Sequence, residues 1–295
     1  MQIKTNSWIK QNLPFLLKLV LTVGCLVFLV IKYQENSIDL EKITWPQHFS
    51  LILLIVSVLM ILNWSLEARR WQVSVKPYEP ISFRKAASVT LQGLALNLVL
   101  PFTTGDATAR LLSMRDKYQT TSAMFLNRFI MLFLTLLFAL FGVWEMTELS
   151  FTLTILILSL LAIALFIFRN QLFQFTQYFK NLSGRTLSLI GSISVFRYLI
   201  FIGQFVLLFQ LFLPEISFSI ILTGISWIFI SKSIIPSLGG GLGIRETSGV
   251  LFFQSIVPDI LLVIIPIFIL WLINTLLPSI LGALLLLKLK TKIAS

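Results

Sequence analysis

The chain has 295 residues, of which 57% are hydrophobic and only 12% are charged, and its mean hydropathy is +0.93. A soluble domain of this length needs far more polar surface, so the composition excludes one and indicates an integral membrane protein. One cysteine and one histidine cannot form a cluster that holds zinc or a redox metal, so we expect no metal and no cofactor. The net charge of +11 is typical of basic cytoplasmic loops, and we expect no nucleic-acid partner.

Six apolar segments approach or exceed the roughly 18–20 residues that a helix needs to cross a bilayer. In chain order they are residues 13–31, 49–66, 122–144, 151–168, 187–213 and 260–287. The first has no small-residue cleavage site after it, so we expect an uncleaved span rather than a signal peptide. These segments predict an all-α polytopic membrane protein in which residues 1–295 form a single domain, with no soluble catalytic domain.

Two further apolar segments, residues 86–100 and 216–235, decide the predicted topology. If both cross, the chain has eight spans, and ten basic residues lie inside against eight outside, which almost erases the positive-inside rule. If residues 81–117 and 216–257 instead enter the membrane and return to their own side, six full crossings remain and the split becomes sixteen to two, with Arg70 among the cytoplasmic residues. We therefore expect six crossings plus two re-entrant hairpins, in the plasma (inner) membrane, with both termini cytoplasmic.

An internal repeat supports the two hairpins. Shifting the chain by 135 residues places Ile81-Ser-Phe83 on Ile216-Ser-Phe218. The same shift aligns three less common residues in each copy, namely Pro101 with Pro236, Gly105 with Gly240, and Arg110 with Arg245. In the six-crossing topology one copy enters from the cytoplasm and the other from outside, so the repeat is inverted, as in many transporters.

The two helix breaks have the chemistry of an anion site. A half-helix that starts at a break directs unpaired backbone N–H groups and a partial positive charge toward it. Glycine lets a ligand approach the backbone, and arginine can bind a phosphate through two parallel hydrogen bonds. If the two breaks face one another, a lipid phosphate would be bound by Arg110, Arg245, Lys232, Gly105, Gly240, Gly241 and Arg197. For Arg197 a position near the cytoplasmic interface is an equal alternative.

The acidic residues beside the two arginines allow several interpretations. Asp106 and Glu246 could neutralise the arginines until a ligand competes, or they could carry protons. Alternatively, Asp106 and Arg110 form an i,i+4 helix pair that only stabilises the hairpin. Because Glu246 follows Arg245 immediately, the two side chains diverge, and we expect each to pair with another segment.

Three stretches resemble one known membrane-protein family. They are Asn63-Trp-Ser-Leu-Glu-Ala-Arg-Arg-Trp71, Asn97-Leu-Val-Leu-Pro-Phe-Thr-Thr-Gly-Asp-Ala-Thr-Ala-Arg110 and Pro236-Ser-Leu-Gly-Gly-Gly-Leu-Gly-Ile-Arg-Glu246. In order and spacing they resemble the lysylphosphatidylglycerol synthase transmembrane region, also called the flippase-like domain. The resemblance implies a protein that moves lipids between leaflets, without the aminoacyltransferase domain that makes the lipid in some members.

Three functions are compatible with these features. The first is a flippase-like or scramblase-like transporter, not an enzyme, whose partners are membrane lipids and whose substrate is an anionic or polyprenyl-phosphate lipid. The second is a membrane-embedded glycosyltransferase or acyltransferase acting on a lipid carrier. The third is a proton-coupled exchanger of small solutes that uses Asp106 and Glu246 as proton sites. The sequence leaves the substrate, the energy source and the oligomeric state open.

Overall fold

The computed structural model describes residues 3–35, 45–100, 104–144, 155, 159, 180, 182–235 and 238–294, and every regular element within these ranges is helical. Five helical segments among them are long and apolar enough to cross a membrane. They lie in α1 (Ile3–Glu35), α2 (Phe49–Val75), α5 (Lys117–Trp144), α8 (Gly184–Phe212), and the continuous run of α11 (Leu261–Trp271), η3 (Leu272–Leu276) and α12 (Leu277–Ala294). The predicted span at residues 151–168 lies outside the described residues, except for residues 155 and 159.

The outer faces of these helices are apolar. On α2, for example, Leu51, Leu54, Val58 and Ile61 are each more than half exposed and follow one another at helical spacing. Such a stripe would be unfavourable in water, but it matches the hydrocarbon core of a bilayer. The predicted all-α polytopic membrane protein is therefore confirmed for the described part of the chain.

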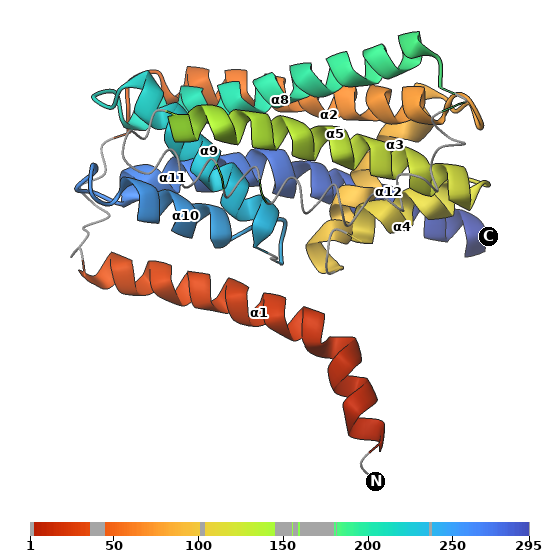
Figure 1. The fold of residues 1–295 in the computed structure, drawn as a ribbon, viewed down its shortest axis with the longest axis horizontal. Coiled ribbons are helices and arrows are strands. Elements are labelled where there is room, and N and C mark those ends of the chain that lie inside the picture. The colour runs from red at the N-terminus through yellow and green to blue at the C-terminus, as the bar shows by residue number, and fades with distance from the viewer. Residues whose placement is uncertain are drawn as a thin grey trace.

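Two short helix pairs interrupt the pattern of long spans. The first is α3 (Phe83–Val99) with α4 (Thr104–Ser113), and the second is α9 (Phe218–Ile234) with α10 (Ile244–Phe253). Both α3 and α9 have 17 residues, so each is about 25 Å long, shorter than the hydrocarbon core. In Figure 1, α3 starts from the right-hand end of the bundle and α9 from the left-hand end, and each chain turns back near the middle.

Similar local signals start and stop the first helix of each pair. Ser82 and Ser217 are the N-caps, and their hydroxyl oxygens accept the backbone N–H of Lys85 at 3.2 Å and of Ile220 at 3.4 Å. At the other end, Leu100 and Ile235 are both extended and close the last helical turn through their N–H groups. The two caps thus lie 135 residues apart, as do the two stops.

Close backbone contacts hold the first pair against its surroundings. Gly105 of α4 lies so near the α3 backbone at Leu96 and Asn97 that a Cβ atom could not fit there. On the other side of α3, Gly282 of α12 packs onto the carbonyl oxygen of Leu91 with the same consequence. Small residues of this kind let helices approach closely where lipid provides no hydrophobic drive for association.

The last span contains a π-helical turn, η3. In this turn the carbonyl of Asn274 accepts the indole N–H of Trp64, at 3.1 Å, from α2. A π-turn inserts one extra residue into a helix and changes the rotation of everything that follows it. It therefore fixes which faces of α11 and α12 meet the rest of the bundle.

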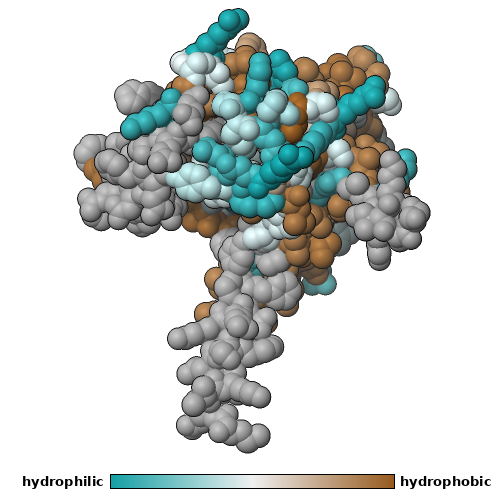
Figure 2. All heavy atoms as spheres, turned by 90° about the vertical axis from the view of Figure 1, so that its right-hand side faces the viewer, coloured by the Kyte–Doolittle hydropathy of each residue, from teal (hydrophilic) through white to brown (hydrophobic). Residues whose placement is uncertain are grey.

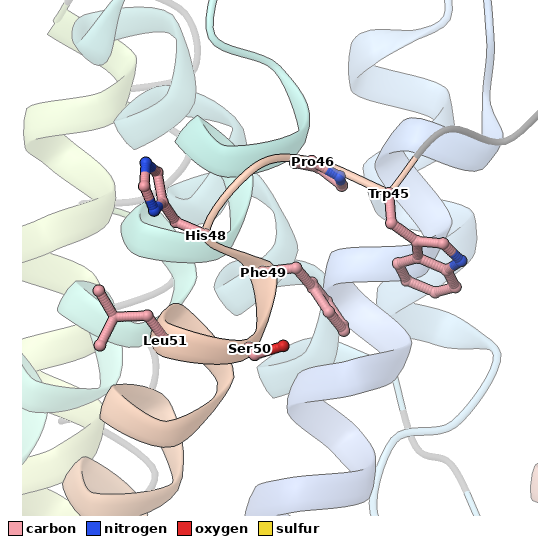
Figure 3. A pocket seen from close by; sticks show the side chains of 6 residues that line it. All are labelled: Trp45, Pro46, His48, Phe49, Ser50 and Leu51. Atoms are coloured by element: carbon pink, nitrogen blue, oxygen red, sulfur yellow. The ribbon is translucent and has the colours of Figure 1, made fainter.

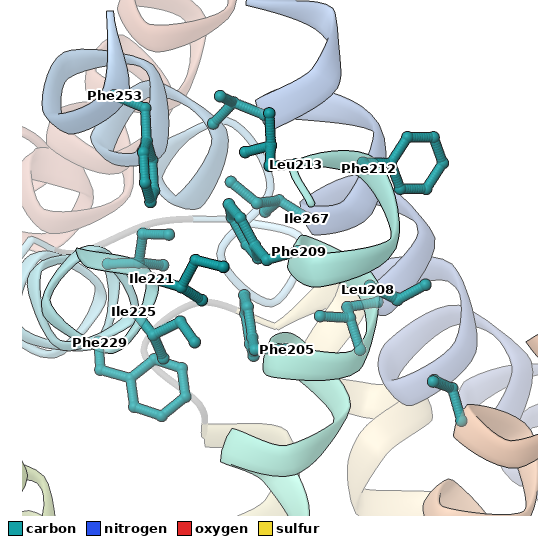
Figure 4. Packing of buried hydrophobic residues seen from close by; sticks show 14 of the residues in the cluster. Phe205, Leu208, Phe209, Phe212, Leu213, Ile221, Ile225, Phe229, Phe253 and Ile267 are labelled. Atoms are coloured by element: carbon teal, nitrogen blue, oxygen red, sulfur yellow. The ribbon is translucent and has the colours of Figure 1, made fainter. Parts of the chain in front are cut away.

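The main apolar core lies between α8, α9, α10 and α11. Phe205 and Phe209 of α8 are fully buried and stack 6.2 Å apart, and Phe209 stacks on Phe253 of α10 at 5.3 Å. Figure 4 shows Ile221 and Ile225 of α9 on one side of these rings. The second helix pair is thus packed through aromatic and branched side chains onto α8, which sets its position.

The two ends of the bundle differ in charge. The loops before α3 and after α4 meet at one end, because Glu79 accepts the backbone N–H of Arg115 at 2.8 Å and pairs with Lys85 at 3.6 Å. Exposed basic residues at the helix ends and loops there are Lys76, Arg84, Lys85, Arg115, Lys117, Arg185 and Lys288. Figure 2 looks onto this end and shows that hydrophilic residues gather on it, and Figure 1 places the C-terminus and the start of α1 toward the same side.

Candidate functional site

One buried carboxylate, Glu67 of α2, binds three arginines. Its side chain forms ion pairs of 2.6 Å with Arg70 of the same helix, Arg110 of α4 and Arg197 of α8. Glu67 is 4% exposed, and none of the three arginines exceeds 8%. We call these four residues, together with Asp106, the Glu67 cluster.

The remaining groups around the cluster satisfy most of its hydrogen bonds. Asp106 accepts a 2.7 Å bond from Nε of Arg110, so the two form an i,i+4 pair, which fits both the neutralising and the purely stabilising role of Asp106. The Arg110 guanidinium also lies over the ring of Trp71, at 4.3 Å from its centroid. Arg197 donates from Nε to the carbonyl and side-chain oxygens of Asn63, at 3.2 and 3.1 Å.

Arg70 connects the cluster to α8 and α5. Its Nη1 donates to Ser194 Oγ at 3.2 Å and to the carbonyl of Asn127 at 3.4 Å. Assigning Arg70 to the cytoplasmic surface is therefore wrong, because it is 5% exposed. Its neighbour Arg69 is exposed, since successive residues of a helix point about 100° apart.

The second site is a glycine loop, residues 239–243, between α9 and α10. Gly239, Gly240, Gly241 and Gly243 have φ angles of +59°, +70°, +98° and +85°. A side chain at such angles clashes with its own backbone, so four glycines in five residues are what this path requires. The loop leads directly into the N-terminus of α10.

Arg245 and Lys232 face the same point of the glycine loop. A Cβ atom placed on Gly241 would lie 3.0 Å from Nε of Arg245 and 3.4 Å from Cε of Lys232. Arg245 is 3% exposed and donates from Nη2 to the carbonyl of Gly240 at 2.6 Å. Its Nε and Nη1 have no hydrogen-bond partner among the described residues, and no described carboxylate pairs with the exposed Lys232.

Glu246 caps α10 instead of reaching another segment. Its Oε2 accepts the backbone N–H of Gly243 at 2.7 Å, and the side chain is 3% exposed. The expectation that Arg245 and Glu246 each pair with a different segment is thus wrong. Both bind backbone groups of the glycine loop, because the loop doubles back over the first turn of α10.

Two other helices fix the glycine loop. The Trp271 indole N–H donates to the carbonyl of Gly239 at 2.8 Å from α11, and Thr275 packs against Gly240. On the other side, Thr22 Oγ1 of α1 accepts the backbone N–H of Leu238 at 3.1 Å. The loop is therefore held from both sides, and the lack of a side chain at Gly241 lets Arg245 and Lys232 approach its backbone closely.

The predicted site residues thus belong to two groups. Arg110 and Arg197 lie in the Glu67 cluster, and Gly105 packs where α4 meets α3. Arg245, Lys232, Gly240 and Gly241 lie together at the glycine loop. A single phosphate site that uses both groups stays a prediction.

Sequence reasoning missed the role of Glu67 and Arg70, although both belong to the first of the three family-like stretches. A usable signal is present in the sequence. An acidic residue inside a 27-residue apolar helix, with a basic residue three positions later, predicts a buried ion pair.

An open hollow of about 630 Å³ lies at the start of α2. Its lining residues are Trp45, Pro46, His48, Phe49, Ser50 and Leu51. Figure 3 shows Trp45 and His48 on opposite sides of the turn before α2. None of the predicted site residues lines this hollow, so its size does not make it the functional site.

Comparison with known proteins identifies a family but no individual relative. Residues 15–282 match the family described as the lysylphosphatidylglycerol synthase TM region. No curated protein and no solved structure matches the chain.

Proposed function

Because the chain belongs to the family of the lysylphosphatidylglycerol synthase transmembrane region, we propose that it is a flippase-like or scramblase-like lipid transporter, not an enzyme. Its ligand is the phosphate headgroup of an anionic phospholipid or a polyprenyl phosphate. The headgroup binds at the glycine loop, beside Arg245 and Lys232. The observation that carries the proposal is that two nitrogens of the buried Arg245 have no hydrogen-bond partner among the described residues.

A buried guanidinium with two nitrogens that lack a partner among the described residues needs an explanation. Leaving a buried polar group unsatisfied costs about 1–3 kcal/mol, and more when the group is charged. Native structures contain few such groups, and functional sites are a common reason for them. Phosphate oxygens bound to Nε and Nη1 of Arg245 would remove the cost and use the planar donor geometry of arginine.

Three further features favour an anion at this position. The N-terminus of α10 contributes a partial positive charge, and Lys232 places a basic side chain beside it. Glu246 directs Oε2 at the backbone N–H of Gly243, so this oxygen is not paired with either basic side chain. The exposed Lys232 gives a charged ligand a first contact before it reaches the buried Arg245.

We further propose that the two helix pairs are re-entrant hairpins of an inverted repeat. The equal lengths of α3 and α9, their shared caps and their start from opposite ends of the bundle support this arrangement. The basic end would face the cytoplasm, with both termini on that side. This arrangement leaves six full crossings, one of which lies outside the described residues.

The two breaks are unequal in this proposal. At the first break, Arg110 is paired with Glu67 and Asp106, so carboxylates already occupy the places that phosphate oxygens would take. At the second break, Arg245 has no such partner among the described residues. The Glu67 cluster would thus position the first hairpin, and the glycine loop would bind the headgroup.

The test is lipid movement by the full chain in vesicles. Protein in vesicles that contain fluorescent phosphatidylglycerol, or in a second set a polyprenyl phosphate, should move at least one of them between leaflets. Arg245→Gln should abolish this movement, because the amide cannot bind phosphate through a charged fork. Arg69→Gln removes an exposed arginine bonded to Gln72 and should leave the rate unchanged. Equal rates for the two variants, or no movement of either lipid, would refute the proposal.

A further inference from the structure

The contact face of α1 combines polar and apolar side chains, and its most buried described residues are polar. Within its described side chains, the buried ones are Lys18 and Thr22, which are 2% and 9% exposed. Leu21, Phe28 and Leu29 are partly buried on the same face. The exposed large apolar side chains are Leu13, Leu16, Leu17, Leu19, Val20, Val23, Leu26, Val27, Val30 and Ile31. A helix that packs against an apolar core buries mainly apolar residues, whereas the two most buried described side chains of α1 are polar.

The feature that α1 borders is the glycine loop with the start of α10. Thr22 accepts the backbone N–H of Leu238 at 3.1 Å, and the carbonyl of Cys25 accepts the hydroxyl of Thr247 at 3.3 Å. A Cβ atom on Gly243 would lie 3.3 Å from Cβ of Cys25. The polar face of α1, with Lys18 one turn before Thr22, therefore forms a wall beside the loop that holds Arg245.

This wall is weakly attached. Among the described elements, α1 packs chiefly against α10, and Figure 1 shows it set apart from the other helices. Hydrogen bonds between helices in a membrane each contribute little stability on average. Lipid surrounds the outer face of α1 in either position, so the exposed apolar side chains on that face do not hold the helix in place.

We propose that α1 is the lateral gate of the headgroup site: it separates from the glycine loop so that a lipid can enter from the bilayer. This inference rests on the function proposed above. A lipid keeps its acyl chains in the bilayer while its phosphate is bound, so its route to Arg245 must open sideways between helices. Of the helices around the loop, α11 is packed into the main core, whereas α1 meets the loop and α10 through Thr22 and Cys25.

The lone native cysteine provides the test. Thr247→Cys places a second thiol beside the backbone of Cys25, and oxidation, or a short thiol-to-thiol crosslinker that spans the remaining distance, should join α1 to α10. In vesicles, the joined protein should lose movement of fluorescent phosphatidylglycerol, and reduction should restore it. Binding of inorganic phosphate, measured by calorimetry, should survive joining, because the free ion needs no lateral opening. The matched control is Cys25→Ser with Thr247→Cys, which should be unaffected by oxidation.

Three results would overturn the proposal that α1 is a lateral gate. Lipid movement could continue at an unchanged rate in the joined protein. Joining could abolish phosphate binding together with lipid movement, which would make α1 part of the site's support. The two thiols could also fail to join by either route, which would contradict the contact itself. Failure of the transport function is distinguishable, because the wild-type protein would then move no lipid under any condition.

Discussion

Among the described residues, Glu67 forms ion pairs with three guanidinium groups, so a change of this one residue affects the three helices α2, α4 and α8. Removing one partner of a buried ion pair leaves the others without compensation. Glu67→Gln should therefore lower the free energy of unfolding by about 3–5 kcal/mol. Thermal or denaturant unfolding in detergent would measure the loss.

The matched control is a carboxylate-to-amide change in an exposed pair. Glu35 pairs with Lys32 at 2.8 Å, but its side chain is 55% exposed. Glu35→Gln should cost no more than about 1 kcal/mol, as is usual for surface pairs. Comparable losses in the two variants would show that the Glu67 cluster is not a stabilising centre.

Gly241 should tolerate no side chain. Its φ of +98° is unfavourable for alanine, and a methyl group there would enter the space next to Arg245. Gly241→Ala should cost about 1–2 kcal/mol of stability and also weaken phosphate binding. Gly191 of α8 is the control, because an added methyl group there would meet nothing within 4 Å, and alanine should stabilise the helix by up to about 1 kcal/mol. Unchanged phosphate binding in Gly241→Ala would refute the placement of the ligand beside Gly241.

At the scale of elements, the tightest helix contact is that of α12 with α3. Gly282→Ala would push the two helices apart at Leu91 and should lower the unfolding free energy by about 1–3 kcal/mol. Gly203 of α8 has open space around it, so Gly203→Ala should have no such effect. Thermal unfolding in detergent compares the two, and an equal melting temperature would mean that this contact does not limit stability.

The sequence predicts where helices begin and end better than it predicts which helices contact one another. The 135-residue shift marks the starts of α3 and α9, because serine caps and extended stops are local signals. The Glu67 cluster could not be predicted in this way. Arg110 lies 43 residues from Glu67, and nothing local states which helix faces meet. The sequence misplaces Arg70 because adjacent arginines suggest an interface, whereas helical rotation puts one of them inside.

At the scale of the whole molecule, the prediction concerns sidedness. In a Cys25→Ser background, a cysteine placed at Arg84 or Arg115 should react with an impermeant maleimide only after cells are permeabilised. A cysteine at Glu215, in the turn between α8 and α9, should react in intact cells. Eight full crossings would place Arg84 and Arg115 on opposite sides. Labelling of these two positions from different sides would therefore contradict the hairpin topology.

The π-turn η3 has a consequence for how the last span can change over evolution. Trp271 before it, Asn274 within it and Gly282 after it each meet a different neighbour: the glycine loop, Trp64 and Leu91. Deleting one residue in this turn would restore regular helix geometry but rotate α12 by about 100° relative to α11. A regular helix at this turn would therefore be incompatible with the contacts that α12 makes with the rest of the bundle. The length of the last span is therefore fixed by its packing: a substitution alters one contact, whereas a change in length displaces every contact that follows it.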